Sequence, residues 1–449
     1  MAETLKPAPR LRLLVTCGVL LELSLLLLYA LPAGGPLVIA FIIIHSFGYL
    51  LLTFLWWKRR RLFPASPALL PVILLFGIIF RCTLVPHSPV ASDDIYRYLW
   101  DGKVSAAGIN PYAYPPNDPH LAHLATPLLP AAVNHPAIGS VYPPVAQWFF
   151  TLSYMIVGES VAGFKALLAL FDIGTMFLLV WLLHSLQRPA EEVILYAWSP
   201  LPLLYGALDG HIDIAGIPFL ILLVLFASRR RFVLSALATA GAALVKIHPL
   251  IIAPLYLRQR SGWRGTMIAM VSLAAFAAAF LPFRSNLGTL AHWLSNYGRN
   301  WEFNGGLFTV LYAWLADNQK THVALNIMLL LWMGWLTLRK APYIENVFLA
   351  LLGLVIFGPV VHPWYLLWLA AMMVIRWSPS VFLLLGLSVV SNVIVYRYVT
   401  TGQWIDDPWL VAIQYIPFAV ALWWEWKGGG FRTAIAAQGQ ASNRRMYPS

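Results

Sequence analysis

The chain has 449 residues, of which 60% are hydrophobic and only 11% are charged, whereas a soluble domain of ordinary composition carries about 25% charged residues. This small number of polar side chains cannot cover a water-facing surface. The composition therefore excludes a soluble globular protein and predicts a polytopic membrane protein. The net charge of +12 does not indicate a nucleic-acid partner, because Lys and Arg stand in short clusters at the ends of apolar segments, as orientation among membrane lipids requires.

The N-terminal part predicts three membrane spans in chain order. A spanning helix needs about 20 mostly apolar residues, and basic residues collect on the cytoplasmic side. Basic side chains near the start place the N-terminus in the cytoplasm: Lys6, Arg10 and Arg12. Three apolar segments then cross in turn, at residues 11–31, 36–57 and 66–85, with "KRRR" (58–61) between the last two. The loop of residues 86–142 is therefore expected on the outer face.

Basic clusters orient the rest of the chain in the same way. We place in the cytoplasm the clusters at 228–231, 257–264, 338–340 and 375–377 and the tail from Lys427. The connections expected on the outer face are 208–213, 246–249, 285–306, 361–365 and 396–408.

Two segments depart from simple spans. A full span at 143–157 would invert everything after it, so we expect a helix that dips into the outer leaflet. The segment 232–257 carries "KIHP" at its centre and predicts two short helices that meet at a break. The expected fold is all-α, a single bundle of about 12–14 transmembrane helices over residues 1–427, followed by a flexible cytoplasmic tail at 428–449.

An acidic pair opens the outer loop. Asp93 and Asp94 directly follow the third apolar segment, and "IYRYLWDGKVSAAG" behind them predicts an amphipathic helix at the membrane interface. One carboxylate is explained by capping of that helix, where the dipole favours negative charge. A second carboxylate at the membrane boundary is what a general base requires. The prolines of "NPYAYPP" and "VYPP" stiffen aromatic walls nearby.

Two polar breaks interrupt apolar sequence at "GHID" (210–213) and "KIHP" (246–249). A cation at such a break holds an anionic group, such as a phosphate, at the depth of the lipid headgroups. Together with a carboxylate base and an aromatic groove, this arrangement favours transfer of a group from a lipid phosphate to a hydroxyl.

Other charged residues have simpler explanations. Lys165 and Asp172 are seven residues apart on one predicted helix, which favours a structural ion pair within the bundle. No metal-ligand spacing is evident, so we expect no metal and no other cofactor. We expect solvated side chains on the outer loops at Asp101, Lys103, Glu302, Asp406 and Asp407.

The order "SDDIYRYLWDGKVSAAGINPYAY", "YPPVAQWF", "GHID", "VKIHP" and "VHPWYLLW" resembles the GT-C polyprenyl-phosphate-sugar glycosyltransferases, above all the bacterial α-mannosyltransferases that use polyprenyl-phosphate-mannose. The resemblance covers residues 66 to 375. It implies that Asp94 is the catalytic base, with Asp93 as second choice, and that Ile212 stands where the family usually has Asn. It also implies a substrate-binding set: Tyr96, Arg97, Tyr112, Tyr142, His211, Asp213, Lys246, His248, His362 and Tyr365.

The resemblance further implies transfer of a sugar, most commonly mannose, with inversion. The polyprenyl-phosphate-sugar would be the donor, and a hydroxyl of a glycolipid or lipid-linked glycan the acceptor. The protein would lie in a bacterial inner membrane, with its site facing the periplasm or the outside.

Three alternatives stay open at this stage. A lipid flippase or transporter should show inverted repeats and polar residues at both faces and at the midplane, and neither is evident. A glycan polymerase or ligase should carry a large Arg-rich loop late in the chain, whereas the largest loop here is early and acidic-aromatic. A scaffolding membrane protein should tolerate loss of one outer carboxylate.

Overall fold

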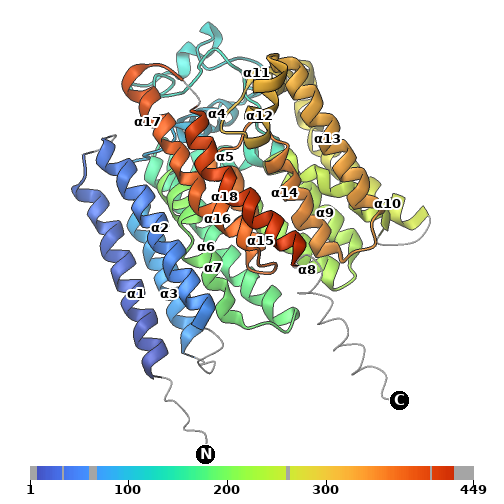
Figure 1. Cartoon of the computed structure of the whole chain (residues 1–449). Helices are drawn as coiled ribbons and strands as arrows, with labels where there is room; N and C mark the ends of the chain where they lie inside the picture. Colours follow the sequence, from blue (N-terminus) through green and yellow to red (C-terminus); the bar gives the residue numbers. More distant parts are fainter. Residues whose placement is uncertain (1–7, 33–34, 60–67, 259–262, 405–406, 429–449) are drawn as a thin grey trace, which may run out of the picture.

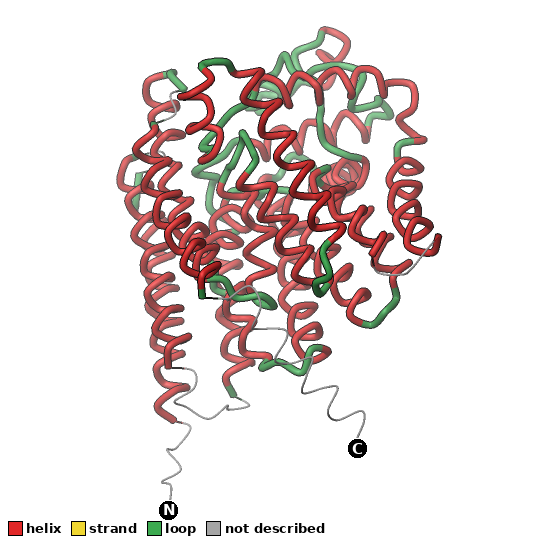
Figure 2. Tube along the Cα trace, turned by 45° about the vertical axis from the view of Figure 1, so that its right-hand side comes forward, coloured by secondary structure: helices red, strands yellow, loops and turns green. Residues whose placement is uncertain are grey.

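The computed structural model describes residues 8–32, 35–59, 68–258, 263–404 and 407–428. Throughout these ranges the named elements are helices, and the only extended pairing within them consists of isolated bridges of Phe303 and Asn304 with Val360. The expected all-α membrane fold is confirmed (Figures 1 and 2). The proposed tail at 428–449 lies outside the described residues except for Gly428.

Fewer long helices are present than the expected 12–14 spans. In the described ranges five apolar helices are long enough to cross a membrane, or six if the bent pair Trp263–Ala279 and Leu281–Asn300 forms one span, at an angle of 62°. The first two coincide with the expected segments, at Leu11–Ala30 and Pro36–Leu55. The difference lies in shorter apolar helices of 10–17 residues, among them α3 (Leu69–Leu84). The length of an apolar segment therefore does not give the number of spans where a segment is divided into shorter helices.

The two unusual segments have the expected local structure. Residues 143–157 form α5 (Pro144–Val157), a helix of 14 residues, which is too short for a full span of about 20. The segment 232–257 is divided into α9 (Phe232–Val245) and η5 (His248–Arg258), with Lys246 extended between them. The prolines that follow the break, Pro249 and Pro254, lack an amide hydrogen and prevent a continuous α-helix.

Helix α8 is apolar and mostly buried, as expected for a central helix. It packs against α6 and α9 and against α15. The helices not yet given bounds are α1 (Ala8–Leu27), α2 (Pro36–Arg59), α4 (Asp94–Ala106), α6 (Val161–Ser185), α7 (Ile194–Ala197), α8 (Asp213–Ser228), α10 (Trp263–Ala279), α11 (Leu287–Asn300), α12 (Gly306–Leu315), α13 (Asn318–Leu338), α14 (Tyr343–Ile356), α15 (Leu367–Met373), α16 (Pro379–Leu387), α17 (Asn392–Thr401) and α18 (Pro408–Lys427).

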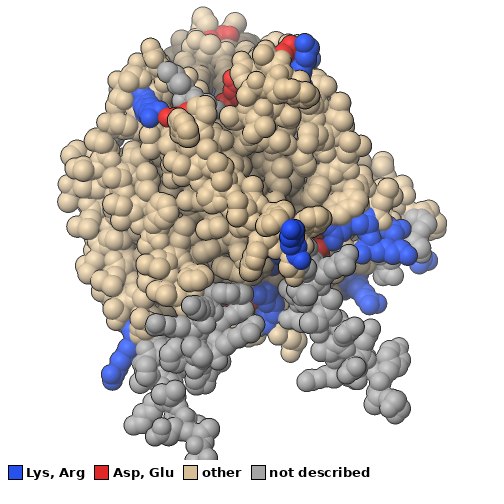
Figure 3. Space-filling view, in the orientation of Figure 1, with Lys and Arg blue, Asp and Glu red and all other residues tan. Residues whose placement is uncertain are grey.

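The two ends of the bundle differ in charge. Helices α4 and α11 lie at the upper end in Figure 1, which we call the site end. Most of the Lys and Arg visible in Figure 3 lie toward the opposite end, where α18 finishes. This asymmetry is the one expected for a protein whose basic end faces the cytoplasm.

The expected ion pair between Lys165 and Asp172 is wrong. Both side chains are buried on α6, but the Asp172 carboxylate binds Arg81 of α3 at 2.6 Å and accepts a hydrogen bond from Tyr196. Lys165 instead donates to backbone carbonyls, those of Leu84, His87 and Leu208. Seven residues along a helix separate side chains by about two turns, roughly 10 Å, so partners on neighbouring helices are closer.

Lys165 also helps to tie together two segments of the site end. Its three carbonyl partners come from the end of α3 and from the end of the π-helix η4 (Pro202–Leu208). Next to them, Asp209 accepts hydrogen bonds from the amides of Val90 and Ala91, at 2.7 and 3.2 Å. The connection that leads from α3 to Asp93 is thus fixed to the loop that carries His211.

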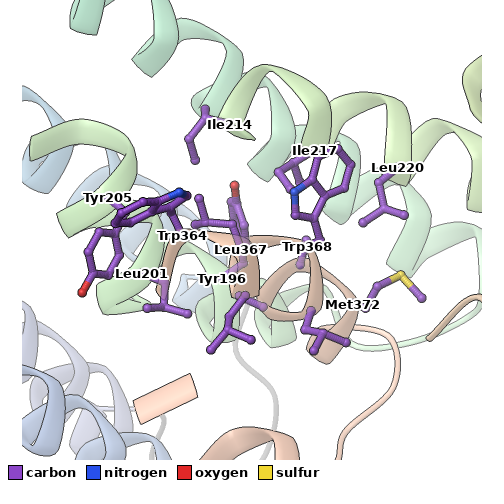
Figure 4. Close-up of a cluster of buried hydrophobic side chains, with 14 of the residues drawn as sticks. Tyr196, Leu201, Tyr205, Ile214, Ile217, Leu220, Trp364, Leu367, Trp368 and Met372 are labelled. Atoms are coloured by element: carbon purple, nitrogen blue, oxygen red, sulfur yellow. The ribbon is translucent and has the colours of Figure 1, made fainter. Parts of the chain in front are cut away.

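An aromatic part of the core packs against η4, the helix that leads into this loop. Figure 4 shows Tyr205 of η4, Trp364 and Trp368 packed among aliphatic side chains of α8 and α15. Trp368 is 1% exposed and its ring lies where a Cβ at Gly216 of α8 would collide with it, at 2.4 Å. Only glycine at position 216 permits this close approach of the Trp368 indole to α8.

Candidate functional site

The acidic pair lies at the beginning of α4. Asp93 is the residue before the first turn and Asp94 is the first helical residue, but Asp93 forms no side-chain capping bond, so the expected capping role is wrong. Both carboxylates instead accept hydrogen bonds from the amide group of Asn134, at 2.6 Å for Asp93 and 2.9 Å for Asp94. Burial, together with the charge of Asp94, raises the pKa of Asp93 above its usual value, and the Asn134 bond opposes that rise.

A buried polar network holds α4 in place through residues one to three turns after Asp94. Asp101 pairs with Arg97 at 3.0 Å and accepts hydrogen bonds from Ser140 at 2.5 Å and Gln147 at 3.1 Å. Lys103 pairs with Glu159 at 2.7 Å. The expectation that Asp101 and Lys103 are solvated is therefore wrong, because α5 and the loop before it cover this face of α4.

The other residues expected to be solvated differ in their surroundings. Glu302 accepts a hydrogen bond from Asn318 at 2.5 Å and is half-buried. Asp407 pairs with Arg397 at 2.8 Å at an exposed position. Asp406 lies outside the described residues.

His211 approaches Asp94 from a different element. Its Nδ1 lies 3.7 Å from Oδ2 of Asp94, and neither ring nitrogen has a hydrogen-bond partner among the described residues. The ring is fully buried and stacks on Trp364, with centroids 4.0 Å apart. Gly210, with φ of +75°, makes the turn from η4 into this position. Ile212, in place of the family's usual Asn, is buried in the core.

Lys246 and Asp213 form an ion pair beside His211. Nζ of Lys246 lies 3.0 Å from Oδ2 of Asp213, and the indole nitrogen of Trp368 donates to the other oxygen at 3.0 Å. The ammonium also lies over the rings of Tyr365 and Tyr142, at 5.1 and 5.7 Å. Burial lowers the pKa of Lys246, but the carboxylates of Asp213 and Asp94 outweigh it and raise that pKa overall.

Aromatic rings complete the wall around these charges. His362 stacks between Phe303 and Trp364, with centroid distances of 4.2 and 4.1 Å, so four rings form one continuous stack that ends on His211. Tyr365 shares a hydroxyl hydrogen bond of 2.7 Å with Tyr297 of α11. His248 lies edge-on to Trp368 at 4.9 Å.

The structure thus groups most of the residues that the sequence singled out, but not all. It brings together one set from the first loop and three later segments: Asp93, Asp94, Tyr142, His211, Asp213, Lys246, His248, His362 and Tyr365. Arg97 is engaged with Asp101 and the Ile138 carbonyl. Tyr112 donates to the Tyr142 carbonyl and packs with Phe283 and Leu290 in a separate small cluster. Tyr96 is half-buried against the main core.

Sequence reasoning missed Asn134 and Tyr297. Asn134 stands 40 residues after the acidic pair in a loop without a recognisable motif, and Tyr297 reaches the site from α11. Only the known tertiary structure reveals either contact. Trp368 belongs to the quoted "VHPWYLLW" stretch. Its spacing of four residues from Trp364 is the sequence feature that could have indicated that both rings lie on one helix face.

Within the described residues, no group of three or more His, Cys, Asp or Glu side chains is arranged as a set of metal ligands. The charges that the site does provide are carboxylates on one side and the partly buried ammonium of Lys246 on the other. Such an arrangement can accept a proton at one position and stabilise a negative charge at another.

This helical bundle with a polar site at one end is that of an integral membrane protein. A model of the alpha-(1->6)-mannopyranosyltransferase N-terminal domain matches residues 16–258, and a model of the MptB C-terminal domain matches residues 318–426. The first match alone covers more than half of the chain. The chain therefore belongs to the alpha-(1->6)-mannopyranosyltransferase family, and the resemblance predicted from the motifs is confirmed.

Individual relatives are distant in sequence. The chain is 26% identical to alpha-(1->6)-mannopyranosyltransferase A of Mycobacterium tuberculosis, over 75% of this chain and 71% of the relative. It is 24% identical to alpha-(1->6)-mannopyranosyltransferase B of Corynebacterium glutamicum, over 82% of this chain and 70% of the relative. A probable enzyme of the same name from Mycolicibacterium smegmatis is 25% identical over 65% of this chain and 62% of its own length.

Proposed function

We propose that the protein transfers mannose from a polyprenyl-phosphate-mannose donor to a hydroxyl of a lipid or lipid-linked glycan, with inversion at the anomeric carbon. The reaction takes place at the site end, which faces the periplasm or the outside of a bacterial inner membrane. The observation that carries the proposal is the placement of the Asp94 carboxylate and the partly buried Lys246 ammonium around the same unpaired His211. Family membership supports the choice of mannose.

Asp94 is the general base in this proposal. Its side chain is 23% exposed, so a substrate hydroxyl can reach it, and its Oδ1 is already bound by Asn134. The other oxygen, Oδ2, removes the proton of the acceptor hydroxyl as the acceptor oxygen bonds to the anomeric carbon. The bond from that carbon to the phosphate oxygen breaks, the electron pair leaves with the polyprenyl phosphate, and the proton passes from Asp94 to water.

Lys246 is the group best placed to stabilise the departing phosphate. It lies 3.0 Å from Asp213, its side chain is only 15% exposed and it is flanked by two aromatic rings, so its charge acts more strongly than it would in solution. Burial lowers the pKa of His211 and that of His248, which favours the uncharged rings beside this cation. The reaction needs no metal in this proposal, because the leaving phosphate meets a fixed positive charge.

The first test is sugar transfer by the purified protein in lipid nanodiscs, supplied with a short-chain polyprenyl-phosphate-mannose and a membrane lipid extract. Asp94→Asn should lower the rate by at least about 100-fold, the lower range for general-base catalysis. The matched control is Asp118→Asn, because Asp118 lies in the same loop and its side chain has the same exposure of 23%. A parallel reaction with EDTA should proceed at the wild-type rate.

Several outcomes would contradict the proposal in different ways. Full activity of Asp94→Asn would move the base elsewhere, with Asp93 as the next candidate. Loss of transfer in EDTA would contradict the metal-free mechanism. If the wild type moved the lipid-linked sugar across a membrane without forming a glycosidic bond, the flippase alternative would replace the transferase.

A further inference from the structure

The acidic pair and the amide that binds it form an unusual group of three side chains. The nitrogen of the Asn134 amide lies within hydrogen-bond distance of Oδ1 of Asp93 and of Oδ1 of Asp94, at 2.6 and 2.9 Å. An amide nitrogen has two hydrogens, which is one for each carboxylate. We propose that Asn134 is a positioning residue that holds both carboxylates as anions and directs Oδ2 of Asp94 toward the acceptor, an inference that rests on the proposed function.

Two neighbouring carboxylates do not remain charged without help. A like charge a few ångströms away disfavours ionisation, and one member of such a pair takes up a proton. Burial and the charge of Asp94 both raise the pKa of Asp93. A protonated acid at Asp93 would donate to Asp94 and weaken it as a base. A donor shared by the two oxygens favours the doubly ionised state instead.

The direction of the bonds leaves one oxygen of Asp94 for chemistry. Oδ1 is occupied by Asn134, whereas Oδ2 has the Tyr98 hydroxyl at 3.4 Å and Nδ1 of His211 at 3.7 Å. Both distances are longer than a good hydrogen bond, so this oxygen is available to an acceptor hydroxyl. The titratable groups that face the pair from the surrounding elements are Tyr98, His135, Tyr142, Asp209, His211, Lys246, Tyr297 and Tyr365.

The loop that presents Asn134 is anchored on both sides. Val133 is buried in the main core, and the Ile138 carbonyl accepts a hydrogen bond of 2.8 Å from Arg97 of α4. Between them His135 has a φ of +44°, a left-handed conformation that costs a non-glycine residue of the order of 1 kcal/mol, and its ring lies edge-on to Trp301 at 5.5 Å. The residue next to Asn134 is therefore held in a strained backbone conformation. Helix α4, which begins at Asp94, binds the end of this loop through Arg97.

The test compares the wild type with Asn134→Ala and the nearly isosteric Asn134→Asp, which removes the donor and adds a third carboxyl. Two readouts are needed. The transfer rate is measured from pH 4.5 to 8.5, and the carboxyl band of protonated Asp is followed by infrared titration of the same nanodisc samples. The band is assigned with Asp93→Asn and Asp94→Asn. The control is Asn117→Ala, an exposed Asn of the same loop.

In Asn134→Ala the acid limb of the rate profile and the midpoint of the infrared titration should both move upward by about one pH unit, the equivalent of one lost charge-assisted hydrogen bond. Asn134→Asp should move both further. Adding Asp93→Asn to Asn134→Ala removes the like charge and should reverse most of the infrared shift. Asn117→Ala should leave both midpoints at the wild-type values.

Two results separate this inference from the proposed function. If Asn134→Ala lowers the rate but leaves both midpoints unchanged, Asn134 has only a structural role and the inference is overturned, while an inactive Asp94→Asn would still support the transferase. If the wild type transfers no mannose, the proposed function fails, and the infrared midpoints alone decide whether Asn134 keeps the pair ionised.

Discussion

At Lys246 burial lowers the pKa of the side chain, whereas the nearby carboxylates of Asp213 and Asp94 raise it. Its ammonium lies between Asp213 and two tyrosine rings, and without it Asp213, whose side chain is fully buried, would be left as an unpaired buried charge. The pair therefore has two roles, to hold the break between α9 and η5 and to present positive charge to a phosphate. Variants can separate the two.

Lys246→Met keeps the length of the side chain and removes its charge. We expect kcat to fall by roughly 100- to 1,000-fold, the range for loss of one electrostatic donor, because the departing phosphate loses its counter-charge. Since this variant leaves Asp213 buried without a cation, the double variant Lys246→Met with Asp213→Asn is measured alongside. It should recover thermal stability but not kcat. Lys320→Met is the control, because Lys320 is 73% exposed in its pair with Asp317. Recovery of kcat in the double variant would contradict a role for the ammonium.

The sequence allowed prediction of those site residues that lie at breaks in apolar segments. Asp94, His211, Asp213 and Lys246 are ionisable groups where lipid-facing sequence is interrupted, and such positions are rarely occupied without function. The roles of Asp101 and Lys103 could not be predicted in this way, because a charge in a loop has the same local pattern whether α5 covers it or water does. Asn134 was missed for the same reason, since only the tertiary structure brings it to Asp94.

At the scale of the elements, the contact between α4 and α5 fixes the direction in which Asp94 points. The two helices approach so closely that a Cβ on Gly102 would lie 2.3 Å from the backbone oxygen of Phe150. Tyr98, one turn after Asp94, stacks on the Phe150 ring at 4.8 Å. A displacement of α5 would therefore be transmitted directly to the first turn of α4.

Gly102→Ala should force these helices apart. We expect a loss of stability of about 1–3 kcal/mol, the usual cost of an added methyl group in a close-packed contact, together with a fall in kcat. The matched control is Gly174→Ala in α6, where nothing lies within 4 Å of the new Cβ; it should leave stability unchanged or raise it by up to about 1 kcal/mol. Thermal unfolding in detergent and the transfer assay measure both effects. Equal behaviour of the two variants would show that the α4–α5 distance does not matter.

Element boundaries could be predicted where the sequence has a proline or a charge, as at the "KIHP" break, but span number could not. Helix α3 is 16 residues long and α5 is 14, and several apolar helices of the bundle share this length. A hydropathy pattern cannot show whether two short helices continue in one direction or turn back. That depends on the helices packed around them, such as α8 within its ring of neighbours.

At the scale of the whole molecule, the separation of charge predicts one orientation in the membrane. The site end should face away from the cytoplasm, because most of the visible Lys and Arg gather at the opposite end (Figure 3).

Single cysteines test this orientation in a variant from which the two native cysteines, Cys17 and Cys82, have been replaced by Ala. His120→Cys, at a side chain that is 69% exposed on the loop before α5, should react with a membrane-impermeant maleimide in intact spheroplasts. Arg229→Cys, exposed after α8, should react only after the membrane is permeabilised. The reverse pattern would place the site in the cytoplasm and would exclude an outer-face reaction.

The stack of four rings from Phe303 to His211 has a consequence for how this family can change over evolutionary time. His211 belongs to the region matched by the N-terminal model and His362 to the region matched by the C-terminal one. Exchange of the first region for that of a relative would replace one ring of the stack, and exchange of the second would replace two. We therefore expect substitutions at the stacked positions of one region to be accompanied by compensating substitutions in the other.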